Sequence, residues 1–480
     1  MLDLSAERDR HYDGRFIVGV LSTGIFCLPS CPARKPKPEN VRFFYSPEAA
    51  AGEGLRACKR CRPELFYQQR DPDREALEAL VASVREAPED FGDVDAMATE
   101  IGFGRSKLHR LLRRHYHASP ATVLQRSRLT RARQELIESR RKVLDVSLAA
   151  GYESPSAFHD NFMRATGLSP GAYRRMTRRS EFVLQLPRDF HEAGTWRYLG
   201  RDVEQATERV EGARVWRGLR LGRRKVIVEL EQKGLRLRCR IADDRPLAPK
   251  AMGELHDRVW RWLGLAADVA GFERKALRDP LWRPLVRGQR GVRLPQTPTV
   301  FESLIWAIVG QQVNLAFAYR LRSVLVELCG RGSGLDSHPT PAEVARLDYD
   351  DLTARQFSRR KAEYVIDVAR WAAERRDRLE ALPTLSATRA ARRLEALRGV
   401  GEWTMQYVLM RGCGFADCVP VGDAGLVKAL AGFYELPARP DAGETRHLMQ
   451  SMSPHRSLAT AHLWASLSKE PRHATEGAAA

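Results

Sequence analysis

Four cysteines near the amino terminus have the spacing of a metal site. Cys27 and Cys31 are separated by three residues, and Cys58 and Cys61 by two, so the thiolates come in two pairs. Structural tetrahedral zinc sites are usually assembled in this way. A segment of this size has little apolar surface, and a bound metal would offset the entropy lost when it orders. The pattern predicts one Zn2+ held by four cysteine thiolates, with no organic cofactor.

A second chemically informative segment lies near the carboxyl end. The glycines of Gly399-Val400-Gly401 stand between two predicted helices, 388–397 and 404–411. Such a turn exposes backbone amides ahead of a helix amino terminus, where a phosphate can bind. A carboxylate, Asp423, follows shortly afterwards. On its own it is well suited to cap a helix predicted at 424–432.

The charge balance indicates a polyanionic partner. The chain has 79 basic and 60 acidic residues, a formal net charge of +19. Basic residues recur along the whole chain, and contacts between such residues and phosphates release condensed counterions. The alternative is a solvated, arginine-rich surface. Charge alone does not separate DNA from RNA or a membrane.

Hydropathy argues against a membrane protein. No apolar run reaches the roughly 20 residues that a membrane span requires. The first fifteen residues are charged and lack the apolar core of a signal peptide. We therefore expect a cytoplasmic, nucleoid-associated protein with no membrane partner. In that reducing compartment the eight cysteines are not expected to form disulfides.

Periodicity divides the rest of the chain. From 73 to about 179 it predicts short helices separated by glycine and Ser-Pro breaks. Strands are predicted at 183–186, 225–230 and 235–241, and helices return from about 252. The expected domains are 1–71, 72–180, 181–292 and 293–470, with a flexible tail at 471–480.

The cysteine segment resembles a known repair family. The stretch Ser22–Arg34, with Cys58-Lys59-Arg60-Cys61, is similar to the amino-terminal domain of Ada-type methylphosphotriester repair proteins. The resemblance implies that Cys27 is both zinc ligand and nucleophile and takes a methyl group irreversibly. It also places Thr23 and Arg34 near the DNA backbone. The alternative is a purely structural zinc finger.

Zinc and charge make this chemistry reasonable. A thiolate is the nucleophilic form of cysteine, and zinc keeps cysteine deprotonated at neutral pH. An all-thiolate site carries a formal charge of about −2, which repels phosphate. Methylation removes one negative charge, so we expect the repaired protein to hold DNA more tightly.

The helical segment contains two helix-turn-helix patterns, at 95–113 and 146–164. The second helix of each pattern should enter the major groove, and Ser106 and Ser154 are expected to cap these helices. The second pattern, with Gly167–Arg174, is similar to AraC-family regulators. A helical spacer is the alternative. The side chains expected on the groove-facing helices are Arg105, Lys107, His109, Ser156, His159 and Asn161.

The carboxyl-terminal half resembles helix-hairpin-helix DNA glycosylases. The matching segments are Phe301–Val313, Leu397–Tyr407 and Val419–Lys428, and the likeness to the 3-methyladenine glycosylase II (AlkA) branch extends over about 181–470. Asp423 matches the essential aspartate of the family. A carboxylate there stabilises an oxocarbenium-like sugar and directs a water onto it, a role compatible with capping.

The same resemblance assigns the remaining contacts. The hairpin glycines, Gly399 and Gly401, would meet the DNA backbone. The aromatic residues Trp403, Tyr407 and Trp464 match positions of the base pocket, where a flipped cationic base would stack. Core packing is an equally reasonable role for Tyr407.

Three departures from related families refine the prediction. Trp403 stands where bifunctional glycosylases have a Schiff-base lysine, so a monofunctional enzyme is expected. The four-cysteine cluster of iron–sulfur members is missing, and so is the Pro-Cys-His-Arg motif of O6-alkylguanine methyltransferases. No iron–sulfur cluster is therefore expected.

Together these features predict a multidomain, mainly α protein. It would combine a small zinc-bound α/β module, an AraC-type double helix-turn-helix, an α+β segment and an all-α glycosylase domain. The expected partners are alkylated and promoter double-stranded DNA and, for activation, RNA polymerase. Two rival functions remain: a regulator with an inert glycosylase domain, and a glycosylase whose zinc module only adds DNA affinity.

Overall fold

The computed structural model describes residues 12–68, 70–330 and 335–467. The chain divides into two compact units, residues 1–79 and 80–480. The predicted tail at 471–480 lies outside the described residues. None of the described helices is long and apolar enough to cross a membrane.

The amino-terminal unit is built on a small sheet. Its strands have the order β3-β1-β2-β4, and only the β2–β4 pair is parallel. The apolar core contains only a few side chains, among them Ile17, Phe26 and Phe44. The elements are β1 (Ile17–Val20), β2 (Ile25–Cys27), η2 (Pro38–Asn40), β3 (Val41–Phe44), α2 (Pro47–Gly52), β4 (Arg56–Ala57) and α3 (Pro63–Tyr67). The four strands and the short helices around this small core confirm the predicted α/β module.

Two helix-turn-helix motifs follow a helix that contains the division between the two units at residue 79. The helices are α4 (Pro72–Glu86), η3 (Pro88–Asp90), α5 (Val94–Ile101), α6 (Arg105–Tyr116), α7 (Pro120–Glu138), α8 (Val143–Ala149), α9 (Pro155–Thr166) and α10 (Pro170–Met176). The motifs are α5–α6 and α8–α9, and α5 to α10 together are called the helix-turn-helix module below. The turn after α5 needs a glycine, because Gly102 has φ +67°.

The caps of the two recognition helices differ. Ser154 caps α9 as predicted, accepting a hydrogen bond from the Ala157 N–H. The prediction that Ser106 caps α6 is wrong, because that helix begins at Arg105 and Gly104 occupies the cap position without a side-chain acceptor.

A five-stranded antiparallel sheet packs on the module. The strand order is β5-β9-β8-β7-β6. The elements are β5 (Glu181–Gln185), α11 (Glu192–Leu199), β6 (Glu208–Glu211), β7 (Arg214–Leu221), β8 (Arg224–Lys233), β9 (Arg236–Ile241) and α12 (Pro249–Trp262). The predicted strands correspond to β5, β8 and β9, whereas β6 and β7 were not predicted because arginines interrupt their apolar pattern.

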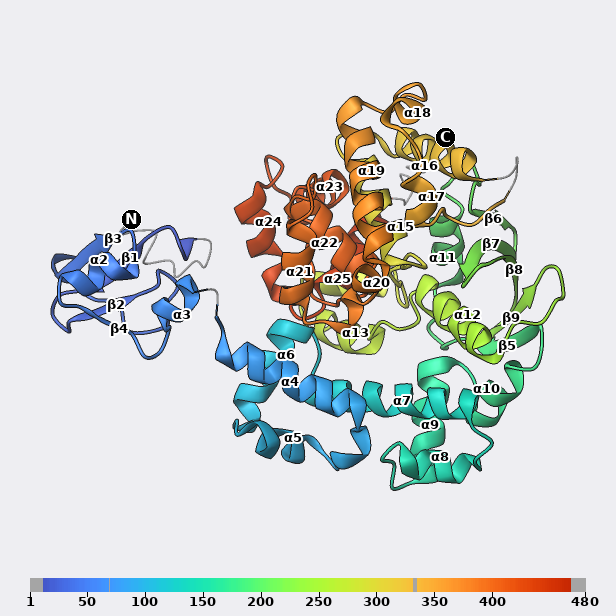
Figure 1. Cartoon of the computed structure of the whole chain (residues 1–480), viewed down its shortest axis with the longest axis horizontal. Helices are drawn as coiled ribbons and strands as arrows, with labels where there is room; N and C mark the ends of the chain where they lie inside the picture. Colours follow the sequence, from blue (N-terminus) through green and yellow to red (C-terminus); the bar gives the residue numbers. More distant parts are fainter. Residues whose placement is uncertain (1–11, 69, 331–334, 468–480) are drawn as a thin grey trace, which may run out of the picture. The chain divides into compact units, whose positions relative to one another are not determined.

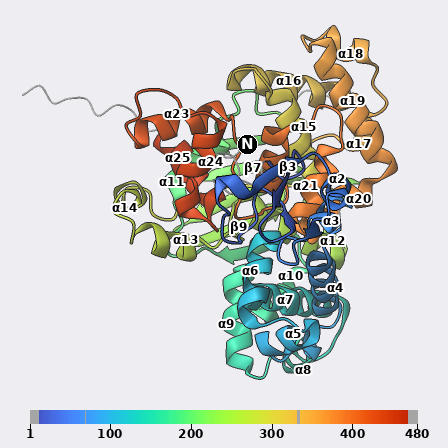
Figure 2. The same cartoon turned by 90° about the vertical axis from the view of Figure 1, so that its left-hand side faces the viewer.

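The module and the sheet share one hydrophobic core. Buried side chains of α7, α9 and α10 belong to the same cluster as those of β5 to β9 and α12. Tyr173 of α10 meets the ring of His256 of α12 at 5.1 Å between centroids, and His256 Nε2 lies 2.7 Å from the Thr166 carbonyl oxygen. Figure 1 shows α7, α9 and α10 on the side of α12 and β5, and Figure 2 shows α10 and α7 below α12. The module is therefore a packed part of the larger unit, with no flexible linker at residue 180.

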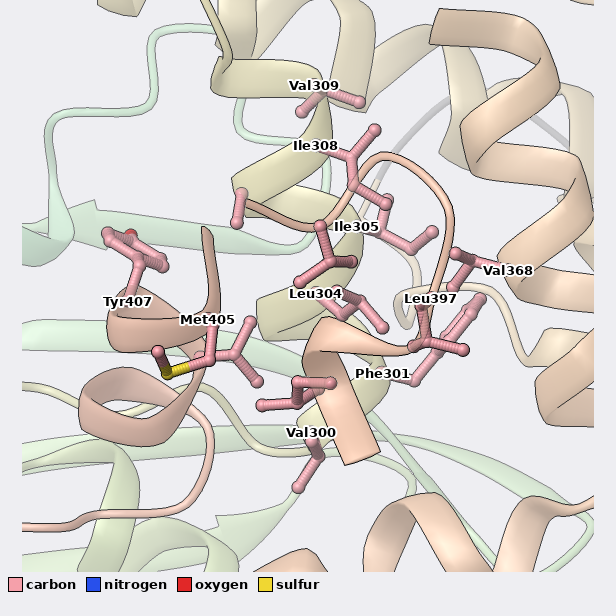
Figure 3. Packing of buried hydrophobic residues seen from close by; sticks show 14 of the residues in the cluster. Val300, Phe301, Leu304, Ile305, Ile308, Val309, Val368, Leu397, Met405 and Tyr407 are labelled. Atoms are coloured by element: carbon pink, nitrogen blue, oxygen red, sulfur yellow. The ribbon is translucent and has the colours of Figure 1, made fainter. Parts of the chain in front are cut away.

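The remaining helices form the last part of the unit. They are α13 (Val269–Ala276), α14 (Trp282–Arg287), α15 (Val300–Gly310), α16 (Leu315–Cys329), α17 (Pro341–Val344), α18 (Tyr349–Thr353), α19 (Arg359–Glu374), α20 (Arg376–Glu380), η4 (Leu382–Thr384), α21 (Ala387–Glu395), α22 (Glu402–Arg411), α23 (Ala424–Phe433), α24 (Ala442–Leu448), η5 (Gln450–Met452) and α25 (Arg456–Ser466). Helix α15 is almost wholly buried and packs against α16, α19 and α22. Figure 3 shows its apolar side chains around Met405 and Leu397.

Buried ion pairs join the sheet to these helices. Arg217 of β7 is 2% exposed and pairs with Glu302 of α15. Arg322 of α16 pairs with Asp202 at 3.2 Å and with Glu302 at 3.3 Å. Breaking one partner would leave an uncompensated buried charge, at a cost of about 3–5 kcal/mol. These pairs fix the sheet against α15 and α16, and α15 in turn packs against α22, which carries Trp403 and Tyr407.

Candidate active sites and DNA interface

The four amino-terminal cysteines converge on one point. Cys27 ends β2 and Cys31 follows a turn, while Cys58 and Cys61 follow β4. Hydrogen bonds tie the two halves together, because the Cys58 N–H donates to the Phe26 carbonyl at 2.9 Å. The four sulfur atoms lie within 4.8 Å of one another. The sequence pairs are thus brought into a single cluster by the pairing of β2 with β4.

This donor set fits tetrahedral zinc. With Zn–S bonds of about 2.3 Å, a tetrahedral site needs sulfur separations of about 3.8 Å, and Cys31 and Cys58 are 4.0 Å apart. Hydrogen bonding from Cys27 lowers the pKa of the Cys31 thiol to about 2. The same contact raises the pKa of Cys27. The sulfurs compete for protons, so a divalent cation is required before all four become thiolates.

Access to the sulfurs differs within the cluster. Cys27 is 9% exposed, against 4% for Cys31 and 8% for Cys58. Cys61 is half-buried, and its sulfur accepts a hydrogen bond from the Leu28 N–H at 3.4 Å. A hydrogen-bonded thiolate is a weaker nucleophile, because the donor stabilises its charge. The geometry therefore leaves Cys27 as a reasonable nucleophile without making it the most open sulfur.

Exposed polar residues surround the cluster. Thr23 lies in the turn between β1 and β2, and Arg34 follows Cys31 by three positions; both are exposed. Two further exposed cations, Lys59 and Arg60, lie between the second pair of cysteines. These were not among the predicted contacts, although their place inside the Cys-x2-Cys motif was visible in the sequence.

The first recognition helix presents its predicted residues unevenly. Arg105 and His109 on α6 are exposed. Arg105 forms an ion pair with Asp95 of the preceding helix. The Lys107 ammonium lies 3.6 Å from the centroid of the Phe103 ring. DNA binding by Arg105 or Lys107 would therefore replace an existing contact.

The second recognition helix also presents its predicted residues unevenly. Ser156 and His159 on α9 are exposed. Asn161 is half-buried, and its Oδ1 accepts a hydrogen bond from the Gln125 amide at 2.9 Å. Asn161 therefore joins α9 to α7 and is less suited to contact a base directly.

The hairpin between α21 and α22 has two unlike glycines. Gly399 has φ +86°, and an added Cβ would lie 2.5 Å from ring atoms of Tyr364. Gly401 caps α22 with φ −89°, and an added Cβ would meet nothing within 4 Å. The Gln311 side chain donates to the Gly399 carbonyl and to Thr404 Oγ1, both at 2.9 Å. Gly399 therefore shapes the turn, while Gly401 leaves space for a ligand at the helix amino terminus.

Asp423 lies at the start of α23, between two tryptophans. Its Oδ1 accepts hydrogen bonds from the Leu426 N–H at 2.8 Å and from Trp464 Nε1 at 3.0 Å. Its Oδ2 accepts one from Trp403 Nε1 at 3.2 Å. The carboxylate caps the helix, as predicted, and is also oriented by two indoles. Such an arrangement holds a negative charge at a fixed point among aromatic faces.

The three predicted aromatic residues lie together. Trp403 and Tyr407 are one helical turn apart on α22, with ring centroids 5.5 Å apart. Tyr407 is 6% exposed, and burial raises the pKa of its hydroxyl. The two tryptophans are half-buried. Tyr407 thus packs in the core behind Trp403, as the alternative interpretation allowed, and still borders the site.

A further group of residues beside the site was not predicted. Arg411 donates to the hydroxyls of Tyr198 and Tyr407, and its burial lowers its pKa to about 9. Trp306 and Tyr319 have ring centroids 4.8 Å apart. One pocket is lined by Tyr198, Trp306, Tyr319 and Arg411. Trp306 stood in the segment Phe301–Val313 and Arg411 ended the predicted helix 404–411, whereas Tyr198 comes from α11 of the sheet region.

Comparisons with known proteins agree with this division of sites. Three family models match the chain: the metal-binding domain of Ada over residues 2–64, a helix-turn-helix domain over 97–176, and the HhH-GPD superfamily of base excision DNA repair proteins over 305–455. The zinc-binding, helix-turn-helix and helix-hairpin-helix predictions are therefore confirmed.

Relatives cover most of the chain. A Mycobacterium tuberculosis protein named "Probable bifunctional transcriptional activator/DNA repair enzyme AlkA" is 31% identical over 484 residues, covering 96% of this chain and 94% of the relative. A Bacillus subtilis DNA-3-methyladenine glycosylase is 29% identical over 290 residues, covering 59% of this chain and 95% of that protein. The structure of a 3-methyladenine DNA glycosylase from Archaeoglobus fulgidus matches with a TM-score of 0.53 at 20% identity, over 59% of this chain and 97% of that one. That structural match shows the fold.

Proposed function

The chain belongs to the family of bifunctional transcriptional activator/DNA repair enzymes, and we propose that it joins three activities. It hydrolyses the N-glycosidic bond of alkylated purines such as 3-methyladenine. It transfers methyl groups from DNA methylphosphotriesters to Cys27. It binds promoter DNA as an AraC-type regulator. The orientation of Asp423 by two indoles is the observation that carries the first activity.

Base excision needs a fixed negative charge and little else from the protein. As the glycosidic bond breaks, the sugar becomes oxocarbenium-like, and the Asp423 carboxylate stabilises this positive charge and directs a water onto the anomeric carbon. An alkylated purine leaves as a neutral base, since it is cationic before cleavage. Trp403 stands where a Schiff-base lysine would be needed, so the reaction ends at the abasic site without strand cleavage.

Aromatic stacking supplies the selectivity. A cationic, electron-poor base binds aromatic faces more strongly than a neutral base does. Trp403 and Trp464 are half-buried beside the carboxylate, and Tyr407 supports Trp403 from the core. Unpaired or damaged bases also cost less to flip out of the duplex. The site therefore favours alkylated purines by charge as well as by shape.

Methyl transfer at the cysteine cluster is a single displacement. Cys27 Sγ attacks the methyl carbon; an S–C bond forms as the methyl C–O bond breaks, and the phosphodiester anion leaves. Bound zinc would be held by Cys27, Cys31, Cys58 and Cys61 and would keep the nucleophile deprotonated. The exposed cations Arg34, Lys59 and Arg60 attract the phosphate backbone. Each protein molecule reacts once, because thiolate is a poor leaving group and the new S–CH3 bond is therefore not broken again.

DNA contacts are proposed at three places. At the zinc module they are Thr23 and Arg34. On the recognition helices they are Arg105, Lys107, His109, Ser156, His159 and Asn161. At the hairpin they are Gly399 and Gly401. RNA polymerase recruitment would follow from binding at a promoter, and chromosomal DNA would keep the protein at the nucleoid.

One experiment tests both chemistries. DNA methylated with a radiolabelled agent is incubated with the zinc-loaded chain, and label is counted in protein and among free bases. We expect label in both fractions. Cys27→Ala should abolish the protein label, and Asp423→Asn should lower base release at least about 100-fold.

Matched controls are available in the chain. Asp441 is exposed and caps α24 by the same kind of bond, accepting from the Glu444 N–H at 2.8 Å, so Asp441→Asn should leave base release unchanged. Cys329, outside the cluster, serves the same purpose for Cys27. Label only on protein would leave a regulator with an inert glycosylase domain. Label only in free base would leave a glycosylase whose zinc module adds DNA affinity.

A further inference from the structure

The loop that presents Asp423 is held from two directions. It runs from Gly412 to Gly422, between α22 and the carboxylate. On one side, Asp417 receives hydrogen bonds from Arg456 at 2.6 Å and from the Ser453 hydroxyl at 2.8 Å. These contacts belong to the glycosylase region itself and anchor the loop to the start of α25.

The other contact comes from the helix-turn-helix module. The Asp417 N–H donates to Nδ1 of His117 at 3.1 Å, between residues 300 positions apart. The His117 ring also meets the Phe415 ring edge to face, with 5.4 Å between centroids. The module thus contacts the loop six residues before Asp423.

His117 is suited to this role by its conformation. It ends α6 in the left-handed region, with φ 52° and ψ 30°. Burial lowers its pKa to about 4, so the ring is neutral at physiological pH and Nδ1 keeps the lone pair that accepts the Asp417 proton. A protonated ring would present a second donor there and could not form this bond.

The contact between His117 and the loop is held in place because α6 is fixed at other points. His115, near the end of the same helix, places Nδ1 2.9 Å from the Thr388 hydroxyl of α21. The module also shares a hydrophobic core with the sheet, through α7, α9 and α10. His117 therefore occupies a set position relative to the loop, while the first turns of α6 carry Arg105, Lys107 and His109.

We propose that His117 is a positioning residue for base excision, which fixes the loop presenting Asp423 by accepting the Asp417 N–H. This role rests on the proposed function, because it requires Asp423 to act in excision. The helix-turn-helix module would then contribute directly to base excision. A recognition helix that reads DNA at one end then stabilises the catalytic loop at the other.

The test compares two replacements of His117 in the full chain. Asparagine tolerates the left-handed conformation, and its Oδ1 corresponds in position to Nδ1 of histidine. Glycine also tolerates that conformation and removes the acceptor. We measure single-turnover release of methylated purines at saturating enzyme, and binding to a duplex that carries an abasic-site analogue. His117→Gly should slow release about tenfold with unchanged affinity, because small misplacement of a catalytic group is costly. His117→Asn should stay within about threefold of the parent rate.

Two controls separate positioning from general packing. Thr388→Val removes another α6 contact without touching the loop, and because the shared hydrophobic core still fixes the module, its loss of rate should be clearly smaller than that of His117→Gly. Ser106→Ala alters an exposed position on the same helix and should not change the rate. If glycine loosens the fold in thermal melts, the glycine and asparagine variants are compared at a temperature at which both are fully folded.

Several outcomes would overturn the role of His117. They are an unchanged rate in His117→Gly, equal losses in the glycine and asparagine variants, a loss confined to DNA affinity, or an equal loss in Thr388→Val. Absence of base release by the parent protein would instead refute the proposed function, before any variant is compared.

Discussion

The cysteine cluster and the Asp423 site are assembled in opposite ways. The four sulfurs come from a short stretch between Cys27 and Cys61, around a core of few apolar side chains. Asp423 is oriented by side chains of two other helices, and its loop is gripped by a histidine 300 positions from Asp417. The first site depends on a metal, whereas the second depends on tertiary packing. They should therefore fail under different conditions.

Removal of zinc should have the largest effect and should be confined to one unit. Zinc contributes about 10 kcal/mol or more to the folding of small thiolate modules. A chelator should expose the amides of residues 12–68 to rapid hydrogen exchange, with protection of residues 80–467 and base release unchanged. Cys58→Ala should show the same rapid hydrogen exchange of residues 12–68 without a chelator. Loss of base release on chelation would contradict the independence of the two sites.

Acid should affect the larger unit in particular. Burial lowers the pKa of His256 and of His462 to about 3. The unfolded chain then binds more protons than the folded one between pH 6.5 and about 3, so stability falls as pH falls through this window. At pH 4.5 the two histidines together cost roughly 5 kcal/mol. Denaturant melts at pH 7 and 4.5 measure this loss.

A variant can assign part of the acid effect. Neither ring nitrogen of His462 has a hydrogen-bond partner within the described part of the chain. His462→Leu should therefore reduce the difference between the two pH values by about half. His447→Leu, at an exposed position on α24, should leave it unchanged. The same dependence on pH in both variants would show that other groups control acid stability.

The hairpin glycines should separate folding from DNA binding. Gly399→Ala should destabilise the larger unit by about 3 kcal/mol, because alanine is strained at positive φ and would press on Tyr364. Gly401→Ala should keep stability but weaken duplex binding several-fold, because its methyl group occupies the space that a phosphate needs. Thermal melts and duplex titration at one salt concentration check both. Equal effects of the two variants on stability would remove the distinction.

A smaller effect than those on folding is expected from the orientation of the carboxylate. Trp464→Phe keeps an aromatic face and removes the N–H that donates to Asp423 at 3.0 Å. A hydrogen bond to a charged group is worth about 1.5–3 kcal/mol, so base release should slow roughly tenfold or more. Trp371→Phe, in a partly buried tryptophan of α19, is the matched control. A normal rate in Trp464→Phe would show that capping alone orients Asp423.

Local patterns predicted local features well. The Cys-x3-Cys and Cys-x2-Cys spacing predicted the cysteine cluster, and the Gly-Val-Gly segment predicted the turn before α22. Strands β6 and β7 were missed, because arginines such as Arg217 serve buried ion pairs and disguise the apolar alternation. The roles of Arg411 and His117 could not be predicted, since each depends on a partner from a distant element.

The sequence by itself determined which residues are chemically able to act: four thiolates in two pairs, a capping carboxylate, and aromatic residues at helical spacing. Those properties are set by residue type and by neighbours along the chain. Only the tertiary structure decided that two indoles orient the carboxylate, that Tyr407 lies in the core, and that the helix-turn-helix module contacts the Asp423 loop. The hydrogen bonds among these contacts join residues 20, 41 and 300 positions apart, and hydrophobic burial, which is not directional, leaves no local pattern that specifies them.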